Sequence, residues 1–164
     1  MEWNQAKEYL KKHGCMNLHS LNADFQLIDI GPASQCSAAL LNSLDPESGC
    51  ILLQQVAQLE QFCQDLNPLA YDLIELSERP ILLQLKTTHK IHPALLQQHS
   101  NWLFHLLAPS PLLSLLQGLR GSYFLQFEGA SFSDCASFEF PDELLADFGI
   151  IKLESNGLVQ VMKP

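Results

Sequence analysis

Short apolar runs alternate with segments of helical periodicity along the chain. Apolar residues recur every three or four positions in residues 3–12 and 56–66, which predicts a helix in each segment. Continuous apolar runs at residues 49–53, 80–85 and 102–107 are too short for helices. Because runs of this length are typical of buried strands, each predicts a strand inside a sheet.

Turn and cap residues mark further elements. Residues 25–30 alternate and end at Gly31-Pro32, as expected for a strand that enters a turn. Ser34 predicts the cap of a short helix over residues 36–44, and Ser110-Pro111 predicts the start of a helix that reaches Leu119. Remaining segments are a strand at 122–127, a helix at 141–149, and paired strands at 149–153 and 158–161 around a turn at 155–157.

The alternation of strands and helices predicts an α/β fold with helices on both faces of a sheet. We found no linker rich in proline or glycine and no internal repeat, so we expect one domain over residues 1–164. Hydrophobic residues make up 47% and charged residues 16%, which is typical of a folded globular protein. No apolar run approaches the ~18 residues of a membrane span, and the first residues lack a secretory signal pattern.

The net charge and the cysteines restrict the kinds of ligand and site that we expect. Eighteen acidic and nine basic residues give a net charge of -9, and the basic residues are scattered along the sequence. This predicts no basic patch and no direct binding of nucleic acid. The five cysteines are an odd number without a CxxC pair, so we expect buried thiols in a cytoplasmic protein rather than disulfides or a metal site.

Common catalytic motifs are absent, including GxGxxG, GxxxxGK[ST], HExxH and GxSxG. Three histidines, His89, His92 and His99, fall in a predicted polar loop over residues 87–100. Because no Asp, Glu or Cys accompanies them, we interpret the segment as a solvated loop rather than a metal site. Glu128 follows the predicted strand 122–127, and ligand clefts of open α/β sheets lie at such strand ends.

The order of elements from Ala6 onward resembles the YrdC-like family, the threonylcarbamoyl-AMP synthases of tRNA modification. Residues 40–62 are similar to the family's helix, lysine/arginine loop, buried strand and following helix, and residues 79–85 to its Pro-Gly-Pro strand. Residues 102–119, 122–133 and 138–149 resemble its arginine-bearing strand and helix, its serine/asparagine loop and its next helix. The resemblance implies a single domain with a twisted, mostly mixed open sheet and helices packed on it.

The sequence departs from the family where cations hold the triphosphate of ATP. Asn42 and Leu44 replace a lysine and an arginine, Ser48 replaces a second lysine, and His105 replaces the strand arginine. The family's Ser-Thr-Ser-Ala-Asn stretch reads Gln126-Phe-Glu-Gly-Ala here, and its Pro-Thr motif is not recognisable between residues 16 and 31. The candidate cleft residues are therefore Asn42, Ser48, His105, Gln126 and Glu128, with no catalytic residue and no metal ligand among them.

These departures predict a catalytically degenerate YrdC-like protein with a non-catalytic binding or regulatory role. Its partner would be a protein of the tRNA-modification pathway or a small ligand. No cofactor is expected, and ATP and Mg²⁺ enter only if the family activity survives. The prediction requires a pocket that has lost its positive charges, with no other lysines or arginines in their place.

Two alternatives remain. An enzyme with altered or residual nucleotide-dependent activity would use His105, Gln126 and Glu128 across one cleft. An interaction module would share only the α/β layout, and its strand order would then differ from the YrdC-like order. For that module, five glutamines predicted on one helix could form the contact face: Gln54, Gln55, Gln58, Gln61 and Gln64.

Overall fold

The fold is taken from a computed structural model, which describes most of the chain. The described residues are 3–21, 23–62, 66–76, 80–84, 89–127, 132, 135–141, 150–153 and 158–163. Two predicted features, the helix at 141–149 and the turn at 155–157, lie largely outside these ranges, and so does Glu128.

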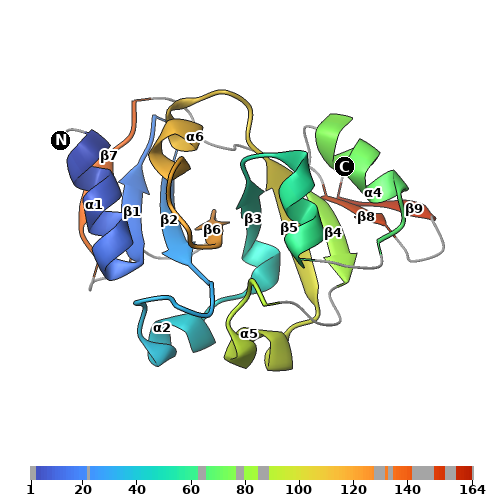
Figure 1. The fold of residues 1–164 in the computed structure, drawn as a ribbon, viewed down its shortest axis with the longest axis horizontal. Coiled ribbons are helices and arrows are strands. Elements are labelled where there is room, and N and C mark those ends of the chain that lie inside the picture. The colour runs from blue at the N-terminus through green and yellow to red at the C-terminus, as the bar shows by residue number, and fades with distance from the viewer. Residues whose placement is uncertain are drawn as a thin grey trace.

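A mixed sheet runs through the molecule (Figure 1). Its nine strands within the described ranges have the order β7-β1-β2-β6-β3-β5-β4-β8-β9. The pairs β1/β7, β3/β5 and β4/β8 are parallel, and the other five neighbouring pairs are antiparallel. The strands are β1 (Cys15–His19), β2 (Asp24–Asp29), β3 (Gly49–Leu53), β4 (Ile81–Gln84), β5 (Asn101–Leu106), β6 (Tyr123–Gln126), β7 (Ser137–Glu139), β8 (Ile150–Leu153) and β9 (Val159–Lys163).

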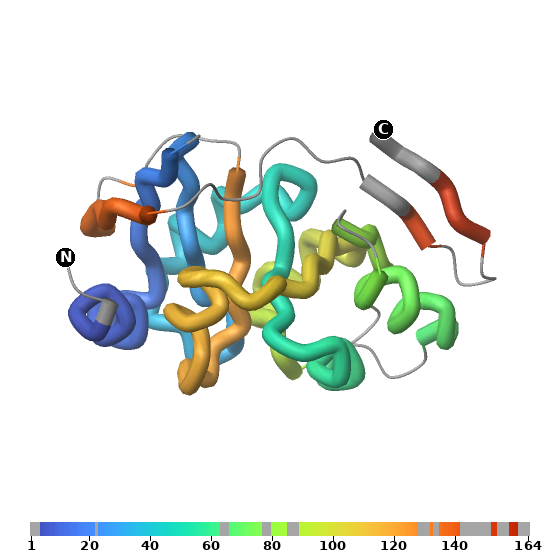
Figure 2. Tube along the Cα trace, turned by 90° about the horizontal axis from the view of Figure 1, so that it is seen from above, coloured from blue at the N-terminus to red at the C-terminus, as the bar shows by residue number. Residues whose placement is uncertain are grey.

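Helices cover both faces of the sheet. The α-helices are α1 (Trp3–His13), α2 (Ala38–Asn42), α3 (Leu59–Phe62), α4 (Leu69–Leu76), α5 (Pro93–Gln98) and α6 (Pro111–Leu116), and the 3₁₀ turns are η1 (Pro46–Ser48) and η2 (Val56–Gln58). Side chains of α1 and α6 join one apolar cluster with Met16, and those of α2, α3, α4 and α5 join a second with Trp102. Viewed from above, α1 and the β8–β9 pair lie at opposite ends of the molecule (Figure 2).

Because successive side chains of a strand alternate between the two faces, the sheet contributes residues to both apolar clusters. In β3, Ile51 and Leu53 belong to the Trp102 cluster, whereas Cys50 and Leu52 belong to the Met16 cluster. Successive side chains of a strand point to opposite faces, so a continuous apolar run is what a strand covered on both sides requires. The sequence prediction of a buried strand over residues 49–53 is confirmed residue for residue.

Two predicted helix boundaries are confirmed. Helix α1 ends at His13 and is followed by Gly14, whose φ of 76° is strained for other residues and whose N–H donates to Leu10 O at 2.8 Å. Ser110 caps α6 by accepting from the Leu113 N–H at 3.3 Å, and Pro111 follows at the first helical position. Helix α6 is shorter than predicted, because it ends before Gly118, which has a φ of 83°.

Other predicted elements are wrong in detail. Helix α2 is capped by Ser37 rather than Ser34, whose hydroxyl instead accepts from the Cys36 N–H. Residues 56–62 form a 3₁₀ turn and one short helix, so Gln54, Gln55, Gln58 and Gln61 do not share one helical face, and Gln64 lies outside the described residues. Strands β1 and β7 and helices α4 and α5 were not predicted, and α5 lies within the predicted polar loop. Short elements carry too little periodicity to stand out in a sequence.

The cysteine prediction is also wrong for one pair. Cys15 and Cys135 form a disulfide with a Cα–Cα distance of 6.0 Å across 120 residues. Cys36 and Cys50 are free thiols, and Cys63 lies outside the described residues. Sequence spacing could not reveal the bond, because it joins β1 to the segment that leads to β7. As for membranes, none of the described helices combines the length and apolar character of a spanning segment.

Candidate functional site

Three buried amide side chains lie in a row across strands β1, β2 and β6. Asn17 is the register partner of Gln26, and Gln26 is the partner of Gln126. The Gln126 amide Nε2 donates to Gln26 Oε1 at 3.3 Å, and all three residues are at least 92% buried. We call these residues the amide row. Because buried polar groups are costly unless they are paired, the Gln26–Gln126 hydrogen bond favours the register that brings these two amides together, whereas Gln26 Nε2 has no hydrogen-bond partner among the described residues.

Asn17 extends this bonding beyond the sheet. Its Nδ2 donates to Phe132 O at 2.9 Å and Cys135 O at 3.0 Å, and its Oδ1 accepts from the Phe132 N–H at 2.9 Å. A single side chain therefore uses three hydrogen bonds to hold the segment that contains the disulfide. The signal in the sequence was a polar residue in an apolar strand, but β1 itself was not predicted.

Two of the predicted cleft residues, Ser48 and Asn42, lie at helix ends. The Ser48 hydroxyl donates to Asp45 O at 2.9 Å, and the Ser48 carbonyl accepts from the Phe127 N–H at 3.0 Å, beside Gln126. Asn42 ends α2 and accepts a 3.4 Å hydrogen bond from Gln98 of α5 at the surface. The structure thus brings Ser48 and Gln126 together, with neutral side chains at both positions.

His105 lies elsewhere. It follows Phe104 of the Trp102 cluster, so it points to the opposite face, and it pairs in register with Leu52 of the Met16 cluster. It is 8% exposed, and burial lowers the pKa of its imidazole. Gln126 shares the face of Phe124, which belongs to the Trp102 cluster. His105 and Gln126 are therefore on different faces, with β3 between their strands.

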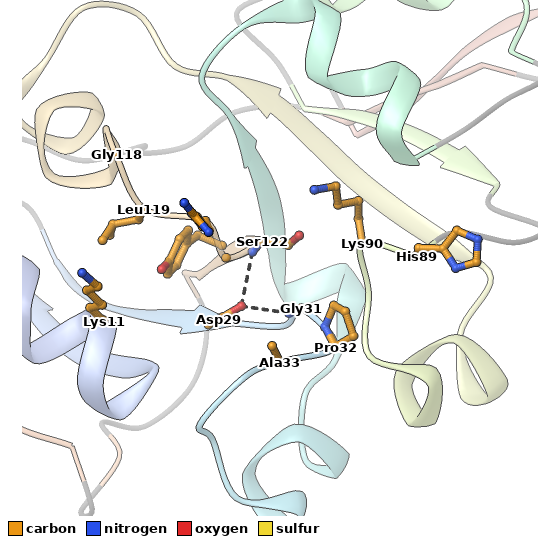
Figure 3. Close-up of a pocket in the computed structure, with 13 residues that line it drawn as sticks. Lys11, Asp29, Gly31, Pro32, Ala33, His89, Lys90, Gly118, Leu119 and Ser122 are labelled. Carbon is orange, nitrogen blue, oxygen red and sulfur yellow. Dashed lines mark hydrogen bonds between the residues drawn. The ribbon is translucent and has the colours of Figure 1, made fainter.

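A cavity of about 610 Å³ opens at the other end of β2 and β6 (Figure 3). We call it the basic cavity, because three of the nine lysines and arginines line it: Lys11, Lys90 and Arg120. Figure 3 shows Lys11 and Lys90 on opposite sides of Asp29 and Ser122. The remaining lining residues are Gly31, Pro32, Ala33, His89, Gly118, Leu119, Gly121 and Tyr123.

The basic cavity corrects one sequence prediction. Scattered basic residues were expected to leave no basic patch. The functional prediction required that no other cations stand in place of the lost ones, and the cations found here lie at the opposite end of β2 and β6 from Gln126. Lys11, Lys90 and Arg120 are 79 and 30 residues apart in the sequence, yet they line one cavity. No local motif could have revealed them, because only the strand order brings their three segments together.

Asp29 fixes the floor of the basic cavity. Its Oδ1 accepts from the Gly31 N–H at 2.9 Å and from the Ser122 N–H at 3.2 Å. Burial raises the pKa of the Asp29 carboxyl, although the two backbone hydrogen bonds oppose this shift. A Cβ at Gly121 would lie 2.7 Å from the Asp29 carboxyl, so the turn can approach this close only as glycine. Burial, together with the charge of Asp29, raises the pKa of Tyr123.

A second cavity of about 290 Å³ adjoins the first, and the two share Lys90 and the turn from Leu119 to Tyr123. Three glutamines of the predicted polar face line it: Gln54, Gln58 and Gln61. Gln58 Oε1 accepts from the Gln54 N–H at 2.6 Å, and Gln54 Nε2 donates to Leu116 O at 3.1 Å. We call it the glutamine cavity. Lys90 and Arg120 therefore line both cavities, and the glutamines add neutral amides to the second.

The three histidines of the predicted loop serve different parts of the structure. His92 caps α5 by accepting from the Ala94 N–H at 3.2 Å, His99 ends the same helix, and His89 lines the basic cavity. Within the described residues, no three His, Cys, Asp or Glu side chains gather as metal ligands would.

Comparison with known proteins identifies the fold. No family model and no curated protein matches the sequence. Among solved structures, E. coli YciO superimposes with a TM-score of 0.67 at 13% identity, over 98% of this chain and 87% of YciO. P. abyssi Sua5 complexed with L-threonine gives 0.67 at 10%, over 92% and 50% of the two chains. HypF in a phosphate- and nucleotide-bound form gives 0.64 at 12%, over 98% and 28%.

This chain spans about half of Sua5 and less than a third of HypF, and nearly all of YciO. At these identities the likeness concerns the fold alone. The mixed sheet and its coverage by helices agree with the expectation from the sequence, and they differ from a regular parallel order. The chain therefore has a YrdC-like fold.

Proposed function

We propose that this chain is a YrdC-like binding protein that does not synthesise threonylcarbamoyl-AMP. The proposal rests on one observation: the positively charged side chains do not lie at the positions where the family resemblance would place them. Asn42, Ser48, His105 and Gln126 are neutral or buried, and each contributes to local structure. The cations lie at the other end of β2 and β6.

Charge placement matters because triphosphate transfer needs cations at the reacting phosphates. Each charge-assisted contact that is lost costs about 1.5–3 kcal/mol, and three such losses would remove useful binding of ATP in the catalytic orientation. HypF in its solved structure holds phosphate and a nucleotide, and Sua5 holds L-threonine. Binding of such a ligand without turnover is the property that we assign to this chain.

An enzyme that uses His105 and Gln126 together is not favoured. The two side chains point to different faces of the sheet, so they cannot meet across one cleft. Burial also lowers the pKa of His105, which leaves the imidazole neutral rather than cationic.

The test is an assay of the full chain with L-threonine, bicarbonate and Mg²⁺-ATP. We expect neither threonylcarbamoyl-AMP by mass spectrometry nor pyrophosphate release above a protein-free control. Sua5 in a parallel reaction shows that the assay works. Product formed by this chain, and lost in Ser48→Ala, would refute the proposal and place activity at the family positions.

A further inference from the structure

The two edges of the sheet differ in length, charge and cover. Strand β7 has three residues, and strand β9 has five. Among the described strands, each has one neighbour, which is β1 for β7 and β8 for β9. An edge strand presents N–H and C=O groups that its own sheet does not pair, so a long edge with little charge is a template for another strand. The longer edge, β9, therefore offers more main-chain groups to a partner.

Strand β7 is protected by its surroundings. Phe138 is buried in the Met16 cluster, and its ring lies 5.3 Å from the ring of Tyr9 in α1. The Tyr9 hydroxyl accepts from the Ala136 N–H at 2.7 Å, which joins the helix to the residue before the strand. Glu139 is exposed at the end of β7, beside its register partner His19. Short length and charge are devices by which natural edge strands avoid pairing.

Strand β9 lacks this protection. Residues 158–163 contain no acidic residue and one lysine, Lys163, at the end of the strand. Leu158 is 54% exposed and Val159 is 41% exposed. Leu76 of α4 is 83% exposed, and α4 lies next to the β8–β9 pair (Figures 1 and 2). Exposed apolar side chains that gather at one end of a molecule are typical of a surface that a partner covers.

The apolar face of the β8–β9 pair continues beyond the part of the molecule that covers it. Leu153 of β8 and Val159 of β9 are register partners, so their side chains lie on the same face of the sheet. Leu153 is buried in the Trp102 cluster together with Ile74 of α4, whereas Val159 is partly exposed. The cover therefore ends between the two strands. A further strand beside β9 would extend this face and bury Val159.

A second copy of this chain fits the β9 edge by symmetry and by charge. An antiparallel pair of identical strands has a twofold axis perpendicular to the sheet, so each copy can satisfy the outward main-chain groups of the other. The same axis keeps Val159 of both copies on one face. A chain of net charge -9 repels its copies, but residues 150–163 contain two lysines and one glutamate. Repulsion is therefore weaker at this edge than the net charge implies.

We propose that two copies of this chain associate by antiparallel pairing of their β9 strands, which makes one continuous sheet. The inference goes beyond the proposed function and does not depend on it. The basic cavity lies at the ends of β2 and β6, and four strands separate β6 from β9: β3, β5, β4 and β8. The interface and the cavity are therefore separate surfaces.

Sedimentation velocity of the full chain over a wide range of concentrations tests the association. We expect a monomer–dimer equilibrium that shifts to the dimer as the concentration rises. Val159→Lys places two like charges at the interface, so it should weaken association by at least about tenfold. Amide hydrogen exchange should show protection of residues 159–163 that rises with the concentration of the original chain and is lost in Val159→Lys.

Leu21→Lys is the matched control. Leu21 is 74% exposed in the turn between β1 and β2, and its replacement changes the net charge equally. Both replacements make the chain less negative, so general repulsion between copies falls in each. We expect Leu21→Lys to associate at least as tightly as the original chain. Equal weakening by the two variants would overturn the proposal.

Two other results would also overturn it. One is a monomer at every concentration, and the other is a dimer that persists unchanged in Val159→Lys, because the copies would then meet elsewhere. Thermal unfolding shows whether each variant is folded. If Val159→Lys is not folded, the exchange data on the original chain decide, because protection of residues 159–163 that does not change with concentration contradicts pairing through β9.

Discussion

Strands β2 and β6 carry polar side chains at both ends, and the two ends differ in charge and exposure. At one end, Gln26 and Gln126 are buried, neutral and bonded to each other. At the other end, Asp29 holds the backbone of a turn, and exposed or half-buried cations face a cavity. At the first end the two amide side chains share one hydrogen bond, whereas at the second end three cations line a cavity. The first end is therefore structural and the second is suited to binding.

We expect the largest change in stability from removing the disulfide near the amide row. We expect Cys135→Ala to lower the free energy of unfolding by about 2–5 kcal/mol, because the disulfide closes a loop of 120 residues in the unfolded chain. Urea unfolding with and without dithiothreitol measures the effect. Dithiothreitol should leave the Cys135→Ala variant unchanged. If it also leaves the original chain unchanged, the bond does not contribute.

Asn17→Leu should cost about 3 kcal/mol or more, since it removes the three hydrogen bonds that hold Phe132 and Cys135. Asn42→Ala is the matched control, because its amide pairs with Gln98 at the surface, and it should cost less than about 0.5 kcal/mol. Chemical denaturation of both variants gives the comparison. Similar losses in the two variants would mean that burial of the amide row adds nothing to stability.

Gln126→Ala should lower the free energy of unfolding by about 1–3 kcal/mol, because Gln26 loses its partner in a buried position. The double variant Gln26→Leu and Gln126→Leu should recover much of this loss, as two apolar side chains need no hydrogen bond. Urea unfolding measures both variants. A double variant that is no more stable than Gln126→Ala would show that the lost partner of Gln26 does not explain the effect.

We expect the smallest change in stability from Asp29→Asn, at the cavity end of β2. The pKa of Asp29 is raised in the folded chain, so its carboxyl favours folding below the ordinary pKa of an aspartate and loses that contribution as pH rises through the raised value. The variant should therefore be more stable than the original chain at pH 7 but not at pH 3.

Thermal unfolding across this pH range checks the Asp29 prediction. Asp45→Asn is a useful control, because Asp45 also accepts a backbone hydrogen bond, from Glu47, but is exposed at the surface. Lower stability of Asp29→Asn at pH 7 would indicate that the hydrogen bonds of the carboxylate to Gly31 and Ser122 outweigh the cost of its burial.

Local pattern was sufficient for much of the fold. The apolar run at β3 and the Ser110-Pro111 start of α6 were read correctly, because a strand buried on both faces and a capped helix each leave a continuous local signal. Short elements failed. Strand β1 mixes Asn17 with apolar residues, and helix α5 has six residues, so neither shows a clear period.

The candidate site could be predicted only in part. The sequence predicted that Asn42, Ser48 and Gln126 stand where the resemblance would place other side chains, and the structure bonds Ser48 to Phe127, the neighbour of Gln126. The apolar residues around His105 favoured a buried histidine, but the sequence did not indicate on which face of the sheet His105 lies, nor that Asn17 is in register with Gln26. The face of a strand residue depends on register, which pairing between distant segments decides.

The sequence by itself determined most of the strands, where several helices begin and how few positive charges the chain carries. Tertiary structure alone decided where those charges meet. Lys11, Lys90 and Arg120 belong to segments that touch only because the ends of β2 and β6, α1 and the segment before α5 converge at one edge of the sheet. Periodicity is a property of neighbouring residues, whereas a cavity depends on strand order and hydrogen bonds between segments far apart in the chain.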